Sequence, residues 1–190
     1  MGRTTLYGVT ATNELHEIYE NKQGMVACLP IWNYFDNKHF PGGFSLFSER
    51  RPCWDLTPNE LSKEEYFALL TSFDGYYFER DHLEEMIRLL KLTHEREVEP
   101  ILSTRLEMFE EASKHEEYNR FFITATSVAD YEDYIDYHYD EELGEYSGEK
   151  TLKDTAWDIW EEFLGDIESI VQKEVDEMFD DDDDDILEEG

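Results

Sequence analysis

The stretch RFFITATSVA, residues 120–129, is rich in the β-branched and aromatic side chains that are enriched in β-strands. Near the N-terminus, apolar and polar residues alternate in two short runs, Leu6–Thr10 and Leu15–Tyr19, with turn-forming residues between them. Alternation on both sides of a turn predicts a β-hairpin. We expect the strand near residues 121–128 to pair with this hairpin and to close a small antiparallel sheet.

Two helices are predicted from the positions of prolines between these strands. Pro30 suits the first turn of a helix that ends before Phe40, and a further helix is expected after Pro100. The predicted inward faces are Ile31, Tyr34 and Phe35 in the first helix, and Leu102, Leu106 and Phe109 in the second.

Two more helices are predicted from capping patterns. Thr57 can accept hydrogen bonds from free backbone N–H groups, Pro58 lacks an N–H, and Glu60 can reach back to the cap. A helix is therefore expected to start at Thr57. Asp81, followed by Glu84, repeats the pattern before another helix. Its apolar stripe is Leu83, Met86, Ile87 and Leu90.

A long C-terminal helix is predicted from Thr151 onward, where apolar residues recur at helical spacing through about seven turns. This stripe comprises Leu152, Ala156, Ile159, Trp160, Phe163, Ile167, Ile170, Val175 and Met178. Six consecutive aspartates follow, Asp180–Asp185, and such a run cannot bury apolar surface. We therefore predict one α+β domain over residues 1–179, with four to five helices, and a disordered acidic tail over residues 180–190.

The segment ADYEDYIDYHYDEELGEYSGE, residues 129–149, fits two periods. In a helix, Tyr131, Tyr134, Ile135 and His138 would share one face. In a strand, Ile135, Tyr137 and Tyr139 would face away from Asp136, His138 and Asp140. Periodicity does not choose between the two structures.

Negative charge is concentrated in the last third of the chain. The chain has 48 acidic and 16 basic residues, with a formal net charge of -32. Residues 1–60 carry a net charge of -2, residues 61–120 carry -7, and residues 121–190 carry -23. Such a field repels free nucleic acid and anionic membranes and attracts basic proteins. Because solubility of a small domain needs a net charge of only ~2 to 8, we infer a role in recognition, with acidic surface concentrated in residues 130–179.

No catalytic signature is present in the sequence. It contains no phosphate-binding loop, dinucleotide-binding fingerprint, zinc-protease motif or nucleophile elbow, and its six histidines are isolated from one another. We therefore expect a protein that is not an enzyme, with no cofactor and no structured metal site.

The cysteines and the N-terminus indicate the compartment. Cys28 and Cys53 lack the short paired spacing of a zinc knuckle or a redox motif, so buried free thiols in a reducing cytosol are expected. The N-terminal residues contain no long apolar run, which argues against a secretory signal and a membrane span. A cytoplasmic protein is predicted.

An acidic ridge is predicted on the C-terminal helix, because carboxylates recur there every four residues. Such a row has a spacing comparable with that of phosphates along a DNA strand, so a basic groove could accept either. The acids of residues 129–149 are expected to extend this surface, with tyrosines stacking against arginine. The predicted partner-binding residues are Asp130, Glu132, Asp133, Asp136, Tyr137, Tyr139, Asp140, Glu141, Glu142, Glu145, Asp154, Asp158, Glu161, Glu162, Asp166 and Glu168.

In its size, its excess of acids and its lack of a catalytic signature, the chain resembles the DNA-mimic proteins of phages and mobile elements. The resemblance covers chiefly Asp130–Glu189. DNA mimics of this kind inhibit restriction enzymes, CRISPR effectors or other DNA-binding host proteins. The resemblance implies an anti-defence protein that acts in the host cytoplasm by occupying the nucleic-acid groove of a basic partner. The nearly neutral N-terminal half departs from a uniformly acidic mimic and is expected to be a scaffold, a homodimer interface or a second binding face.

Three alternatives stay open at this point. The same acids would serve an immunity or chaperone-like protein that neutralises a basic toxin nuclease or a histone-like protein. Carboxylates and histidines assembled by the fold would suit a small metal-assisted hydrolase. The acids could also form an ordinary solvated face that binds no partner.

Overall fold

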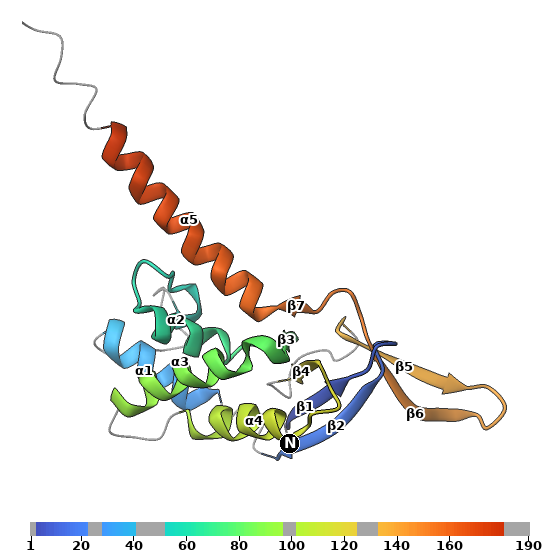
Figure 1. The fold of residues 1–190 in the computed structure, drawn as a ribbon. Helices are drawn as coiled ribbons and strands as arrows, with labels where there is room; N and C mark the ends of the chain where they lie inside the picture. Colours follow the sequence, from blue (N-terminus) through green and yellow to red (C-terminus); the bar gives the residue numbers. More distant parts are fainter. Residues whose placement is uncertain (1–2, 23–27, 41–51, 97–101, 125–132, 181–190) are drawn as a thin grey trace, which may run out of the picture.

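The computed structural model describes residues 3–22, 28–40, 52–96, 102–124 and 133–180. These residues form five α-helices, a five-stranded sheet and a separate two-stranded sheet (Figure 1). The fold class is α+β, as predicted. None of the helices in these ranges is long and apolar enough to cross a membrane.

The larger sheet has the strand order β2-β1-β4-β3-β7. Its strands are β1 (Thr4–Val9), β2 (Leu15–Asn21), β3 (Tyr76–Glu79), β4 (Arg120–Thr124) and β7 (Trp157–Asp158). The predicted hairpin is confirmed as β1 and β2, and β4 pairs antiparallel with β1, as predicted. β3 pairs antiparallel with β4, whereas the short strand β7 pairs parallel with β3, so the sheet is not wholly antiparallel. Residues 125–129 of the predicted strand lie outside the described residues.

Successive side chains of β1 and β4 pack into two different cores. Leu6, Phe121 and Ile123 belong to the larger core, which the helices complete. Tyr7 and Phe122 belong to a smaller core, because neighbouring residues of a strand point to opposite faces of a sheet. The smaller core is completed by Val9, Leu15, Ile135 and Leu152. Both faces of the central strands are therefore covered.

Four helices, together with the five-stranded sheet, form the body of the protein, and the first turns of a fifth helix join them in the larger core. The four helices are α1 (Leu29–His39), α2 (Lys63–Leu70), α3 (Leu83–Arg96) and α4 (Ser103–Lys114). The helices predicted after Pro30 and Pro100 are confirmed as α1 and α4. Asp81 lies in a 3₁₀ turn, Arg80–His82, that leads into α3.

α2 begins at Lys63, so the prediction of a helix start at Thr57 was wrong. Ser62 and Glu65 form the capping box, with Glu65 N–H donating to Ser62 Oγ and Ser62 N–H donating to Glu65 Oε2. Thr57 does bind Glu60, through its N–H at 2.9 Å and its hydroxyl at 2.8 Å. Those contacts close a turn before the helix.

The C-terminal helix, α5 (Ile159–Asp180), begins eight residues later than predicted. Leu152 ends a strand and packs in the smaller core, whereas Ile159 packs in the larger core. The helical spacing of Leu152, Ala156 and Ile159 thus does not reflect one helix face. Asp158 caps the helix, because its Oδ1 accepts hydrogen bonds from the N–H groups of Trp160 at 2.9 Å and Glu161 at 3.1 Å.

Residues 135–152 form a second hairpin, β5 (Ile135–Asp140) and β6 (Glu145–Leu152). The strand alternative for this segment is therefore the one observed. The hairpin and α5 extend from the body in opposite directions, the hairpin to the right and α5 to the upper left in Figure 1. The tail from residue 181 onward lies outside the described residues, and Asp180 is the last residue of α5.

Candidate partner-binding surface

The β5–β6 hairpin is anchored to the body at its base. Ile135 and Leu152 form a cross-strand pair and are almost completely buried in the smaller core. The N–H of Leu152 donates to the carbonyl of Asn13 at 2.8 Å, and the N–H of Lys153 donates to the carbonyl of Tyr134 at 2.9 Å. Beyond this base, every residue from Asp136 to Glu149 is exposed except Asp140, which is partly exposed.

The acids near the hairpin tip are exposed and lack cationic neighbours. Glu141, Glu142 and Glu145 form no ion pair among the described residues. Asp140 closes the turn, because its Oδ1 accepts hydrogen bonds from the N–H groups of Glu142 at 2.8 Å and Leu143 at 3.1 Å. The predicted binding residues of this segment therefore lie together on one projecting element.

The hairpin carries two further acids away from its tip. Asp136, at the base, pairs with Lys153 through an Oδ1–Nζ distance of 3.2 Å. Glu149 on β6 is exposed, although it was not among the predicted binding residues. Its position in the hairpin depends on how β5 and β6 pair, and the alternation of residues within one strand does not predict that pairing. Of the remaining predicted residues in this region, Asp133 is exposed, whereas Asp130 and Glu132 lie outside the described residues.

The predicted ridge of Asp154, Asp158, Glu162 and Asp166 does not exist. Asp154 precedes β7, and Asp158 belongs to β7 and caps α5. Asp166 accepts a hydrogen bond of 2.5 Å from the hydroxyl of Tyr66 on α2, so this carboxylate helps to hold α5 against the body. The predicted acids that do lie on α5 are Glu161, Glu162, Asp166 and Glu168.

The pKa values of Tyr66 on α2 and Glu162 on α5 are shifted where the two helices meet. Burial, followed by the hydrogen bond to Asp166, raises the pKa of Tyr66. Burial and the negative charge of Asp166 raise the pKa of Glu162. The hydrogen bond from Tyr66 to Asp166 and the stacking of Tyr66 on Phe163 show that this part of α5 packs against the body. Because the hairpin extends away from α5, the two groups of acids form separate surfaces, not the continuous one expected (Figure 1).

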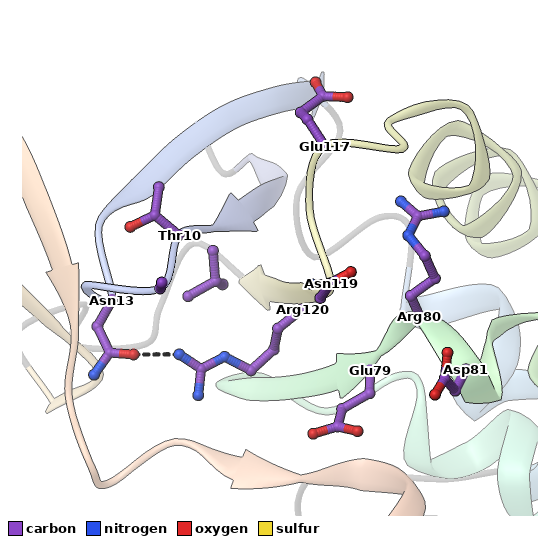
Figure 2. Close-up of a pocket in the computed structure, with 10 residues that line it drawn as sticks. Thr10, Asn13, Glu79, Arg80, Asp81, Glu117, Asn119 and Arg120 are labelled. Atoms are coloured by element: carbon purple, nitrogen blue, oxygen red, sulfur yellow. Dashed lines mark hydrogen bonds between the residues drawn. The ribbon is translucent and has the colours of Figure 1, made fainter.

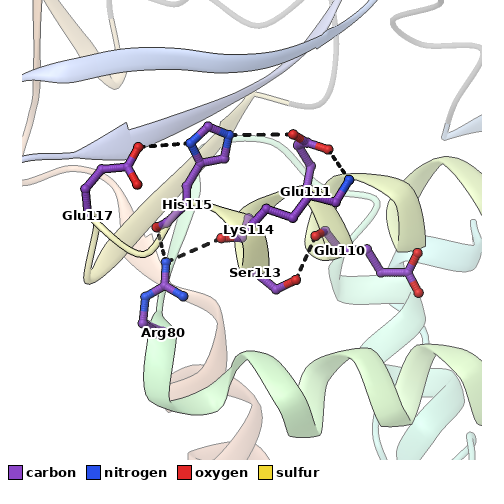
Figure 3. Close-up of polar contacts among 8 residues, drawn as sticks. Arg80, Glu110, Glu111, Ser113, Lys114, His115 and Glu117 are labelled. Atoms are coloured by element: carbon purple, nitrogen blue, oxygen red, sulfur yellow. Dashed lines mark hydrogen bonds and ion pairs between the residues drawn. The ribbon is translucent and has the colours of Figure 1, made fainter.

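In the body, by contrast, many acids have cationic neighbours. Figure 3 shows Glu111 between Lys114, at 2.6 Å, and His115, at 3.6 Å, while His115 also contacts Glu117 at 3.0 Å. Arg80 donates to the carbonyl oxygens of Ala112 and His115 at the end of α4. Further ion pairs are Lys38–Glu65, Arg88–Glu85 and Lys91–Glu110.

A polar cavity of about 700 Å³ lies beside the β1–β2 turn (Figure 2). Its two arginines are already engaged in the fold. Arg120 donates to Asn13 Oδ1 and lies 5.4 Å from the ring centre of Tyr77, and Arg80 binds the carbonyl of Tyr118 at 2.7 Å. Three carboxylates, those of Glu79, Asp81 and Glu117, also line the cavity. This mixture of engaged cations and acids favours no particular ligand.

The thiols are free and buried, as expected. Burial raises the pKa of Cys28, and burial together with the charge of Asp36 raises the pKa of Cys53 to about 12. Both side chains are therefore poor nucleophiles at neutral pH. Within the described ranges, no group of three or more His, Cys, Asp or Glu side chains is placed to hold a metal ion.

No protein-family model matches this chain, and neither the curated proteins nor the solved structures contain a match to it.

Proposed function

We propose that this protein binds a positively charged surface of a nucleic-acid-binding protein and competes there with the nucleic acid. This is the action of a DNA mimic, such as an anti-restriction or anti-CRISPR protein of a phage or mobile element. The observation that supports it is the projecting β5–β6 hairpin, whose tip carries exposed acids without cationic neighbours.

The physical argument concerns where the charge lies. Carboxylates that have no local counterion produce a field that attracts cations, and a projecting element can enter a concave site. Residues 136–150 contain six acids and a single lysine. Electrostatic attraction of this kind accelerates association and opposes binding to anionic partners such as free nucleic acid.

The test is capture of partners from a host lysate at about 0.15 M salt, where the Debye length is about 8 Å and weak long-range attraction is screened. The captured protein is then challenged with a DNA duplex. We expect a nucleic-acid-binding protein to be captured and to be released by the duplex. A captured partner that the duplex does not displace would contradict competition with nucleic acid.

Charge reversal assigns the effect to the hairpin. The variant Glu141→Lys, Glu142→Lys, Glu145→Lys should weaken binding of the captured partner at least about tenfold. The matched control is Glu17→Lys, Glu84→Lys, Glu116→Lys, three exposed acids of the body that give the same change in net charge. Equal loss in both variants would mean that net charge alone drives binding and would reject the hairpin as the binding element.

A further inference from the structure

The β5–β6 hairpin has one aromatic face. Tyr137 and Tyr139 lie two residues apart on β5, and Tyr146 is the cross-strand partner of Tyr139. Ile135 precedes them at the same alternation and is buried in the smaller core. The apolar face that anchors the hairpin therefore continues outward, beyond the body, as a row of tyrosines.

These three tyrosines, the tyrosine face, contact one another although they are exposed. The ring centres of Tyr139 and Tyr146 are 5.4 Å apart with an interplanar angle of 80°, and those of Tyr137 and Tyr146 are 6.4 Å apart at 78°. Their exposed fractions are 39% for Tyr137, 54% for Tyr139 and 66% for Tyr146. Leu143 in the turn is 70% exposed. A contiguous exposed patch of this kind is typical of an interaction site, where tyrosine is enriched.

A second copy of this chain is a poor occupant for the tyrosine face. Six acids and one lysine lie within residues 136–150, so two hairpins placed face to face would bring like charges together. The single lysine, Lys150, does not offset this, because its Nζ lies 5.3 Å from the ring centre of Tyr7 at the base of the hairpin. The surface favours a cationic occupant.

Among cationic side chains, arginine suits this surface better than lysine. The planar guanidinium stacks on aromatic rings and retains N–H groups that can bind carboxylates in its plane. Glu145 is adjacent to Tyr146 in the sequence, and Asp140 is adjacent to Tyr139. Asp140 and Glu145 are also a cross-strand pair, and their side chains lie on the opposite face of the hairpin from the tyrosines, so they add negative charge around the tyrosine face without lining it.

We infer that the tyrosine face of the β5–β6 hairpin binds an arginine-bearing segment of a cationic protein, with the guanidinium groups stacked on Tyr139 and Tyr146. This inference rests on the proposed function for the positive charge of the partner. It adds the chemical class of the contact, namely arginine recognition by aromatic stacking on an acidic hairpin.

The probes are two synthetic peptides, nona-arginine and nona-lysine, titrated into the full-length protein by calorimetry at about 0.15 M salt. We expect the arginine peptide to bind about 5- to 10-fold more tightly than the lysine peptide. The double variant Tyr139→Leu, Tyr146→Leu should lose most of this preference while its affinity for the lysine peptide changes by less than about twofold. An unchanged preference would overturn the inference.

Two control variants and a test for dimerisation make the result specific. The variant Tyr139→Phe, Tyr146→Phe keeps the rings and should keep the preference for arginine. Trp54→Leu removes a ring that is 42% exposed in the body and should also keep it. Concentration-dependent dimerisation that is lost in the double leucine variant would show that a second copy covers the face, and would overturn the inference.

The inference and the proposed function fail in different ways. If the variant Glu141→Gln, Glu142→Gln, Glu145→Gln weakens both peptides while the tyrosine variant affects neither selectively, arginine recognition is overturned and charge-based binding is supported. If the tyrosines select arginine but DNA does not displace the captured partner, the inference is supported and the proposed competition is contradicted.

Discussion

The body and the β5–β6 hairpin surround their acidic residues with different neighbours. In the body, Glu111 contacts Lys114 and His115, and Glu65 contacts Lys38. At the hairpin tip, Glu142 and Glu145 are exposed and form no ion pair among the described residues. Exposed ion pairs add little stability, but they reduce the field that an approaching molecule meets. The difference teaches that the charge of several acids in the body is offset locally, whereas the charge of the acids at the hairpin tip is not.

The largest expected contrast is in the core. Phe78 is completely buried and stacks on Phe109 at 4.8 Å and on Phe121 at 5.4 Å. Phe78→Ala should lower the free energy of unfolding by about 3–5 kcal/mol, measured by urea denaturation. Tyr146→Ala in the hairpin should change it by about 0.5 kcal/mol or less. Similar losses at the two sites would break the distinction between body and hairpin.

A smaller contrast is expected at two glycines with positive φ. Gly75, at φ +80°, would place a Cβ 2.4 Å from the ring of Tyr134, whereas Gly148 in β6, at φ +84°, has no atom within 4 Å of that position. Gly75→Ala should therefore cost about 2–4 kcal/mol, and Gly148→Ala only the backbone strain of about 1–2 kcal/mol. Thermal and urea unfolding of both variants would measure the difference. Equal costs would mean that the close approach of Tyr134 is unimportant.

The next effect depends on pH. Burial alone would raise the pKa of Glu65, but hydrogen bonds from Lys38 and Ser62 lower it below its ordinary value. A lowered pKa in the folded state stabilises the protein at neutral pH, and this contribution is lost as the pH falls through the acidic range. Glu65→Gln should cost about 1–2 kcal/mol at pH 7 and less at about pH 3, by urea unfolding.

Glu145→Gln in the hairpin is the control for this pH effect. Because Glu145 is exposed and has no ion pair among the described residues, its replacement should leave stability nearly unchanged at both pH values. A pH-independent cost of Glu65→Gln would contradict a role for its ionisation.

The smallest effect separates a structural acid from a binding acid. Asp158 caps α5, so Asp158→Ala should lower stability by about 1 kcal/mol, whereas Asp158→Asn should retain most of the cap. Both variants should bind a cationic partner as tightly as the unmodified protein does. Selective loss of binding without loss of stability would return Asp158 to the recognition surface.

The sequence correctly predicted those helices and strands whose local pattern agrees with their packing in the fold. The β1–β2 hairpin, β4 and the apolar stripe of α3 follow from alternation or helical spacing, and the structure has them where they were expected. β3 was not predicted, and β7 is only two residues long. The pairing of these strands depends on residues far apart in the chain, which local pattern does not contain.

For the surface, the composition of residues 129–149 pointed to the acidic segment whose residues 135–149 belong to the projecting hairpin, but it did not provide the geometry of that hairpin. Tyr146 was not selected, because its place beside Tyr139 depends on the hairpin register. The ridge through Asp154 and Asp158 was wrong, because the spacing of Leu152 and Ile159 matches a helix although the two residues serve different cores. The cap made by Asp158 marks the start of α5 at Ile159.

The attachment of the β5–β6 hairpin through Ile135 and Leu152 has a consequence for how such a chain can change over generations. Adding or deleting two residues in each strand beyond that pair would keep the tyrosines on one side, while a one-residue change in a single strand would turn them over. A matched change of two residues in each strand would therefore alter how far the hairpin reaches without moving the pair Ile135 and Leu152 that anchors it.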